Sequence, residues 1–271
     1  MNSDSIPLLR KRQNNKDSAE ERFNRRNYFF FSSRENMDPQ SAQAANRKYV
    51  IIYGIATGLG VIILTIVLAW LLKYEEGFGF STAGEYFCWH PLLMVFGMVF
   101  CYSQSMLIFR TGRKVLKNKL KLVHMTVNMT ALVVSILGVV AAFASHAVRH
   151  PPTPDLYTLH SWIGLTTVIL FGIQFIIGFT GFLFPGYSPA RRALILPIHV
   201  AIGTAIFVFA IVAAITGVAE KTIFTLGRTY QDLPNAGVLL NVIGYLIVIF
   251  GALILYLVNA HEYKRVPLAE D

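Results

Sequence analysis

Four of the seven histidines lie within or at the ends of long apolar segments, where an ionisable side chain is costly and commonly serves a function. They are His90, His124, His160 and His199, at successive spacings of 34, 36 and 39 residues. Because consecutive membrane helices run in opposite directions, His90 and His160 begin their helices at one face, and His124 and His199 lie near the other. The spacing therefore predicts an outer pair, His90 with His160, and an inner pair, His124 with His199.

Two imidazoles that face each other at one depth are typical ligands of a six-coordinate haem iron, so two pairs predict two haems within a four-helix bundle. Three glycines, Gly164, Gly203 and Gly97, follow a histidine by four, four and seven residues and are expected to leave room for the flat rings. A single membrane histidine can instead be an ordinary hydrogen-bonding residue. Zinc also binds imidazole, but neither HExxH nor CxxC spacing occurs in the sequence.

The segments around these histidines are six apolar runs of about 20 residues, the length that a helix needs to cross a bilayer. They cover residues 49–72, 91–109, 122–144, 159–184, 194–218 and 237–258. The chain is 54% apolar, with only 24 Lys and Arg and 15 Asp and Glu. This composition predicts an all-α membrane protein with six transmembrane helices, the central four of which hold the two haems.

The basic residues indicate how the chain is oriented. Twenty of the 24 Lys and Arg lie in the first 48 residues, the loop 110–121, the loop containing Arg191 and Arg192, or the C-terminus. By the positive-inside rule, both termini are cytoplasmic, so the net charge of +9 reflects orientation and predicts no nucleic-acid partner. We expect a disordered cytoplasmic tail over 1–48, a transmembrane domain over 49–260 and a cytoplasmic tail over 261–271.

The two cysteines are predicted to stay free. Cys88 and Cys101 are thirteen residues apart in the chain. On a helix that spacing is about 20 Å, whereas a disulfide needs Cα atoms within roughly 7 Å.

Several short segments resemble the signature segments of the cytochrome b561 family. They are Tyr157-Thr158-Leu159-His160-Ser161-Trp162, Trp89-His90-Pro91, Lys121-Leu122-Val123-His124 with Asn128, and Pro197-Ile198-His199-Val200. The resemblance runs from about Tyr49 to Arg265 and differs from the usual YSLHSW string at Thr158. It implies two haem b groups with bis-histidine ligation, cytosolic ascorbate as electron donor, and ferric iron or monodehydroascorbate as acceptor on the far side. Whether the chain forms a homodimer stays open.

A donor site for the ascorbate anion needs positive charge beside the inner pair. Lys117 and Lys121 precede His124 by seven and three residues, and Arg192 precedes His199 by seven. If both helices extend that far, these cations share a face with the histidines. The family uses matching basic residues for ascorbate. The alternative is that all three only anchor the topology.

On the other side, His146 and Glu220 are the candidate acceptor-site residues, since imidazole and carboxylate suit ferric iron or its chelate. His146 matches a family position associated with the acceptor, although an ordinary solvated loop histidine is an equal alternative.

The sequence therefore favours a transmembrane oxidoreductase that passes single electrons from cytosolic ascorbate to an external acceptor. Two rival hypotheses are a proton-coupled transporter with histidine relays and a non-catalytic haem-bearing subunit. Residues 4–9, DSIPLL, have the pattern of an endosomal or lysosomal sorting signal. The predicted location is a late endosomal, lysosomal or other vesicle membrane, with the plasma membrane as the alternative.

Overall fold

The computed structural model describes residues 39–266 and 268, and every regular element among them is helical. The long helices are α2 (Pro39–Tyr74), α3 (Ala83–Met94), α4 (Tyr102–Thr111), α5 (Lys117–Ala147), α6 (Leu159–Phe182), α7 (Pro189–Leu226) and α8 (Asn235–Asn259). A π-helical segment, Val95–Cys101, joins α3 to α4, and short 3-10 helices cover Gly227–Asp232 and His261–Tyr263. The expected sorting signal at 4–9 and most of the expected disordered tail lie outside the described residues. The expectation of disorder is wrong for residues 39–48, because α2 already begins at Pro39.

Within residues 39–266, six helical stretches are long and apolar enough to cross a membrane, which confirms the predicted number of spans. The second is the continuous stretch Ala83–Thr111, made of α3, the π segment and α4. Several spans begin earlier than the apolar runs do: α3 begins eight residues before the predicted start of its span, and α5 and α7 each begin five before theirs. The prediction counted only runs of apolar residues, so it left out the first turns of these helices, which contain polar residues. Consequently His90, His124 and His199 lie inside their helices, and only His160 is near a helix start.

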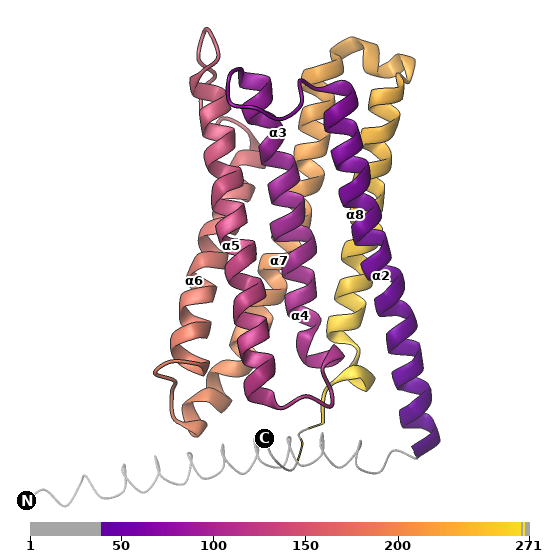
Figure 1. Cartoon of the computed structure of the whole chain (residues 1–271), viewed down its shortest axis with the longest axis vertical. Coiled ribbons are helices and arrows are strands. Elements are labelled where there is room, and N and C mark those ends of the chain that lie inside the picture. The colour runs from indigo at the N-terminus through magenta and orange to yellow at the C-terminus, as the bar shows by residue number, and fades with distance from the viewer. Residues whose placement is uncertain (1–38, 267, 269–271) are drawn as a thin grey trace, which may run out of the picture. The chain divides into compact units, whose positions relative to one another are not determined.

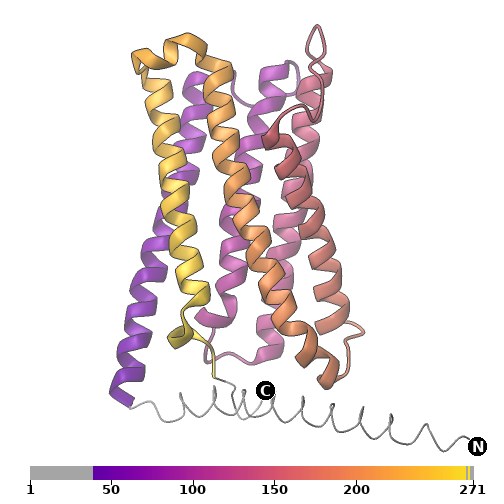
Figure 2. The ribbon, with the colours of Figure 1, turned by 180° about the vertical axis from the view of Figure 1, so that it is seen from behind.

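Residues from Tyr49 onward form one compact unit in which the long helices run side by side (Figures 1 and 2). Helices α3 and α4 pack on α5, α6 packs on α7, and α7 packs on α8. In both views α2 and α8 lie together on one edge of the bundle, away from α6 (Figures 1 and 2). The four spans that carry the paired histidines are therefore neighbours in space.

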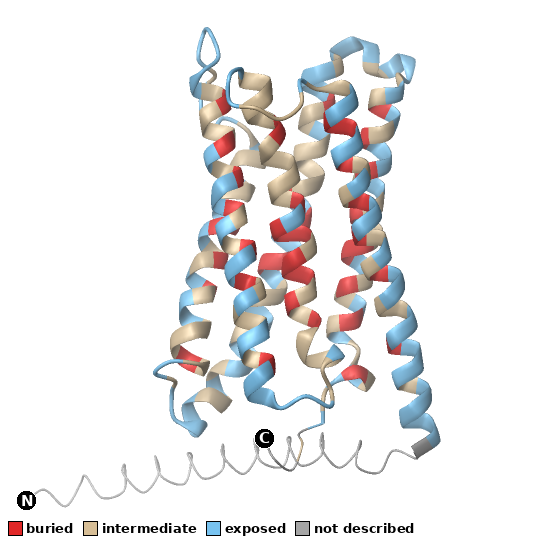
Figure 3. Ribbon diagram, viewed as in Figure 1, coloured by how far each residue is buried: buried red, intermediate tan, exposed pale blue. Residues whose placement is uncertain are grey.

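Buried residues gather on the faces where the helices meet, and the outward faces are exposed (Figure 3). Many of the exposed side chains are large and apolar. Helix α2 lies close to its neighbours at Gly60, where an added Cβ would come within 2.7 Å of Phe100 and 3.0 Å of Phe250. Exposed side chains such as Ile176 and Leu194 would be unfavourable in water but suit a lipid environment.

The π-helical segment lies in the middle of the second span, and its bonding pattern, N–H to the carbonyl five residues back, changes the rotation of α4 relative to α3. Pro91 lies inside α3 directly after His90. Proline has no N–H to donate, and neighbouring helices compensate for such gaps in a membrane.

The two cysteines remain free thiols, as predicted, and both are buried. One of them, Cys101, ends the π-helical segment, whereas Cys88 lies in α3.

Candidate functional site

The outer pair is held by two capped helices. Thr82 caps α3 by accepting a hydrogen bond from the Glu85 backbone N–H at 3.1 Å. Thr158 caps α6, and its side chain and that of Ser161 exchange bonds with each other's backbone N–H at 3.2 Å. His160 is the second residue of α6, so this capping box fixes the turn that carries its imidazole.

The structure brings together the histidines that the sequence pairs by depth. The ring centroids of His90 and His160 are 6.0 Å apart, with an 82° angle between the planes. Those of His124 and His199 are 6.4 Å apart, with a 66° angle. The four rings come from α3, α5, α6 and α7, one from each of the four central spans.

Both separations fit a metal ion held between two imidazoles. Bonds from a metal ion to two opposed ring nitrogens measure about 2.0–2.1 Å each, so the nitrogens of such a pair are roughly 4 Å apart. The two ring radii make up the remaining distance to the centroids. No group of three or more His, Cys, Asp or Glu able to hold a metal occurs among the residues that the structure describes. Each pair offers two imidazole ligands, and a macrocycle could supply the remaining ones.

Hydrogen bonds orient three of the four rings through Nδ1. The Nδ1 atom of His90 is 2.9 Å from the Gly138 carbonyl oxygen, and that of His160 is 2.9 Å from the Ala213 carbonyl oxygen. The Nδ1 atom of His124 is 3.0 Å from both the carbonyl oxygen and the hydroxyl of Ser105. A carbonyl acceptor fixes the proton on Nδ1 and leaves Nε2 unprotonated, which is the form that ligates a metal.

The inner pair is less symmetrical. The Nδ1 atom of His199 is buried and has no hydrogen-bond partner. Its backbone carbonyl accepts a bond of 2.6 Å from the side-chain amide of Gln174, a buried residue of α6. This ring is therefore held mainly by packing and by the position of its own helix turn.

Two glycines that the sequence analysis missed support the rings from the facing helix. A Cβ at Gly217 on α7 would lie 2.7 Å from Cε1 of His160, and one at Gly178 on α6 would lie 3.0 Å from Cε1 of His199. Each glycine follows the histidine on its own helix by 18 residues, five helical turns, and so shares its face. That matched spacing is a signal by which both could be found.

The three glycines expected to make room for rings behave differently from one another. Beside Gly164 there is open space, with no atom within 4 Å of an added Cβ, and this residue lines the outer cavity. The expectation for Gly97 is wrong, because its Cβ position lies 2.8 Å from the Ser135 hydroxyl and serves contact with α5. It is also wrong for Gly203, which faces the side chains of Gln174 and Tyr102 at 3.5 Å.

A cavity of about 540 Å³ surrounds the outer pair and opens toward that end of the bundle. It is lined mainly by apolar residues of α3, α6 and α7, together with His90 and His160. At its rim the Lys221 ammonium group pairs with the Glu75 carboxylate at 2.9 Å. Such a deep apolar cavity with two imidazoles facing into it matches the needs of a flat, largely apolar cofactor.

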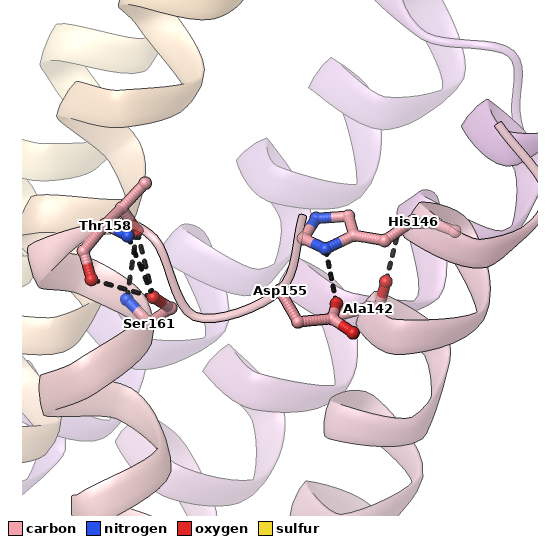
Figure 4. A network of polar contacts seen from close by, with 6 residues as sticks. Ala142, His146, Asp155, Thr158 and Ser161 are labelled. Atoms are coloured by element: carbon pink, nitrogen blue, oxygen red, sulfur yellow. Dashed lines mark hydrogen bonds and ion pairs between the residues drawn. The ribbon is translucent and has the colours of Figure 1, made fainter. Parts of the chain in front are cut away.

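The candidate acceptor residues lie at this rim. His146 and Glu220 both line the cavity, and the Nδ1 atom of His146 is 2.8 Å from the Asp155 carboxylate (Figure 4). The same figure shows that Asp155 lies in the loop that leads to the Thr158 cap, two residues before His160 (Figure 4). Roughly a third of the His146 side chain is accessible to solvent. A soluble acceptor can therefore reach this pair from outside the bundle.

At the opposite end, a smaller pocket of about 400 Å³ lies between the start of α5 and the loop before α7, with Lys121 and Arg192 in its lining. The Lys121 ammonium group donates to the Phe182 carbonyl oxygen at 3.2 Å, and the Arg192 Nε atom is buried with no partner. Lys117 is the first residue of α5, and its positive charge repels that of Lys121. Lys117 is not part of the pocket lining. Two of the three predicted donor-site cations thus share one pocket.

Comparisons with known proteins agree with one another. The family model described as eukaryotic cytochrome b561 matches residues 89–225. The chain is 40% identical over 212 residues to the human lysosomal membrane ascorbate-dependent ferrireductase CYB561A3, covering 76% of this chain and 87% of that protein. It is 39% identical to the mouse plasma membrane ascorbate-dependent reductase CYBRD1, covering 76% and 72%. It is 38% identical to the pig transmembrane ascorbate-dependent reductase CYB561, covering 79% and 83%.

Proposed function

Because this chain belongs to the eukaryotic cytochrome b561 family, we propose that it is a multi-pass membrane oxidoreductase that carries electrons from ascorbate across the membrane to ferric iron. The observation that carries this function is the presence of two imidazole pairs near opposite ends of the central helices, with ring centroids 6.0 and 6.4 Å apart. The rival hypotheses of a transporter and of a non-catalytic subunit lose their support, since the relatives are named as reductases.

The family cofactor is haem b, and the proposal is two haems per chain, one for each histidine pair. Bound haem supplies one-electron chemistry, its iron cycling between the ferrous and ferric states. His90 and His160 would be the axial ligands of the outer haem, and His124 and His199 those of the inner haem. The Nδ1 bonds to backbone carbonyls support this assignment because they leave Nε2 of three ligands free to bind iron.

The donor site is proposed for the pocket that contains Lys121 and Arg192. Ascorbate is an anion at neutral pH, and two cations in a partly enclosed pocket attract it and hold it by charge-assisted hydrogen bonds. The unpartnered Arg192 Nε atom supports the proposal, since a bound anion would satisfy it. Lys117, at the start of α5, lies outside the pocket lining and would add long-range attraction for the anion.

The acceptor site is proposed at the rim of the outer cavity, where His146 and Glu220 lie. Imidazole and carboxylate groups suit ferric iron or a ferric chelate, and the Asp155 carboxylate, which contacts His146, adds negative charge at this rim. Monodehydroascorbate is the alternative acceptor, and it would be attracted to cations at the same rim. Supplying ferric chelate and monodehydroascorbate together, and measuring which one the reduced protein reduces faster, distinguishes the two acceptors.

Orientation, tails and location also belong to this proposal. The donor pocket faces the cytosol, with the basic loops and both termini on that side. Residues 1–48 are a cytoplasmic tail, 49–260 the transmembrane domain and 261–271 a cytoplasmic C-terminal segment. The membrane is lysosomal or endosomal, or else the plasma membrane, in keeping with the relatives named for lysosomal and plasma membranes. A homodimer is the proposed assembly to be tested by its mass in detergent.

The decisive experiment uses purified full-length protein in sealed vesicles of known orientation. The absorption spectrum should show b-type haem at two per chain, and ascorbate outside inside-out vesicles should reduce it. Ferric chelate enclosed in the vesicles should then be converted to ferrous iron. Absence of haem bands, or equal reduction from both sides, would contradict the proposal.

A further inference from the structure

Three aromatic side chains fill the centre of the four-helix bundle. Tyr102 on α4, Phe171 on α6 and Phe207 on α7 are exposed by only 4%, 2% and 0%. The ring centroids of Tyr102 and Phe171 are 4.5 Å apart, and those of Tyr102 and Phe207 are 5.9 Å apart. The Tyr102 hydroxyl donates a hydrogen bond of 2.7 Å to the Gly203 carbonyl oxygen, which fixes its ring. These three residues are called the aromatic layer below.

The outer cavity ends at the aromatic layer. Its lining includes three residues that lie one helical turn from the layer, Val99, Thr167 and Ala210. They precede Tyr102 by three residues, precede Phe171 by four and follow Phe207 by three. On α6 and α7 these spacings place Phe171 and Phe207 on the face that lines the cavity, one turn beneath it, and the Tyr102 ring packs against both of them.

The residues that contact the inner pair lie one helical turn beyond the aromatic layer, on the side away from the outer cavity. Ser105 follows Tyr102 by three residues and lies 3.0 Å from the Nδ1 atom of His124. Gln174 follows Phe171 by three and donates to the His199 carbonyl oxygen at 2.6 Å. The aromatic layer therefore separates the space around the outer pair from the inner pair, with one helical turn on each side.

We propose that the aromatic layer is the medium through which electrons pass from the inner to the outer haem, and that its ring packing sets the transfer rate. This inference rests on the two-haem function proposed above. The rate of electron tunnelling falls steeply with distance. It falls faster with distance across an empty space than through packed atoms. The layer places packed rings between the two sites, because the three side chains are buried and Tyr102 lies within stacking distance of both Phe171 and Phe207.

The redox balance is simple. With both haems bound, the one electron lost by the ferrous inner haem would be the electron that reduces the ferric outer haem. No bond forms or breaks, and no proton moves. Tyr102 keeps its proton, since its hydroxyl is the donor in the bond to Gly203, and it is not oxidised. The three side chains are thus positioning residues that shape the path.

The test measures transfer between the haems in full-length protein that carries both. Oxidised protein is mixed rapidly with ascorbate, and the absorption of each haem is followed separately, with bands assigned from variants of the histidine pairs. The variants are Phe171→Leu and Phe207→Leu, which stay apolar but remove ring contact. The matched control is Phe209→Leu, since Phe209 lies on the same helix as Phe207 and is 45% exposed. Haem content per chain is measured for each.

We expect inner-haem reduction to keep its wild-type rate, while the following reduction of the outer haem slows several-fold in Phe171→Leu and Phe207→Leu. The control should match the wild type. Two full haems with unchanged transfer in both layer variants would overturn the proposal. Tyr102→Phe keeps the ring and should preserve the rate; if it abolishes transfer while retaining both haems, tyrosine oxidation replaces the passive role. Wild-type protein without haem, or not reduced by ascorbate, would instead contradict the function proposed above.

Discussion

Gly217 lies directly against the imidazole of His160, so close that an added Cβ would be 2.7 Å from the ring carbon Cε1. The contact joins α6 and α7 at the outer pair, where the Ala213 carbonyl, one turn earlier on α7, is bonded to the same ring. The backbone of α7 therefore both supports the ring and fixes its rotation. Any side chain at this position must push the imidazole out of that orientation.

Gly217→Ala is accordingly expected to weaken haem binding at the outer site. Overpacking of this kind costs about 1–3 kcal/mol, which corresponds to a roughly fivefold or larger loss of affinity. Haem retained per chain during purification and the spectrum of the outer component measure the effect. Gly54→Ala is the control, since nothing lies within 4 Å of its Cβ position. An unchanged outer haem in Gly217→Ala would show that the ring has freedom to move.

The pairing of ligands predicts which mutants share a defect. His90→Ala and His160→Ala should lose the same spectral component, and His124→Ala and His199→Ala the other, because each pair holds one iron. Haem per chain should fall from two to about one in each case. His150→Ala, an exposed loop histidine, should keep both haems. Loss of one common component in His90→Ala and His124→Ala would refute the assignment.

The donor pocket predicts a change in ascorbate affinity without loss of haem. Charge-assisted hydrogen bonds contribute about 1.5–3 kcal/mol each, less where solvent reaches them, so Lys121→Ala with Arg192→Ala should raise the half-saturating ascorbate concentration roughly tenfold or more. Initial reduction rates against ascorbate concentration measure this. The pair Lys114→Ala with Lys119→Ala removes equal charge from exposed positions and is the control. Equal weakening in both double mutants would mean that only net charge matters.

A fourth prediction concerns the segment after α8, which Tyr263 attaches to the bundle. Its side chain is fully buried and packs edge-on against Tyr49 at a centroid distance of 5.3 Å. The Arg110 side chain donates to the carbonyl of Ala260 at 2.5 Å and to that of Val258, which holds the end of α8. Burial also raises the pKa of the Tyr263 phenol above its usual value, as expected for a group removed from water.

Tyr263→Ala should therefore lower thermal stability, since removing a buried aromatic ring costs about 3–5 kcal/mol. Tyr263→Phe should cost much less because the ring contacts remain. The midpoint of thermal unfolding, followed by loss of the haem absorption band, is the measurement. Tyr245→Ala on α8, where the side chain is 68% exposed, serves as control. A midpoint unchanged by Tyr263→Ala would mean that this segment does not stabilise the bundle.

Much of the site was predictable because the relevant signals are local. Runs of apolar residues gave six spans, and the distance of each histidine from the ends of its span gave its depth, hence the two pairs. Lys117, Lys121 and Arg192 were predicted to share one donor site because each precedes its histidine by nearly whole helical turns. Helices α5 and α7 do extend over all three, but only Lys121 and Arg192 line the pocket.

Only the tertiary structure shows how each helix is rotated about its own axis, and therefore which side chains face a neighbouring helix. Gly97 was expected to leave room for a ring, but its Cβ position lies against the Ser135 hydroxyl and the Ala131 carbonyl oxygen of α5, so this glycine allows close packing of two helices. The carbonyl partners of the rings and the supporting glycines lie on facing helices, so their identity depends on how two helices are rotated and shifted against each other. Spacing along one chain fixes depth in the membrane, but the contacts between helices come from side-chain packing over the whole bundle, which no local pattern records.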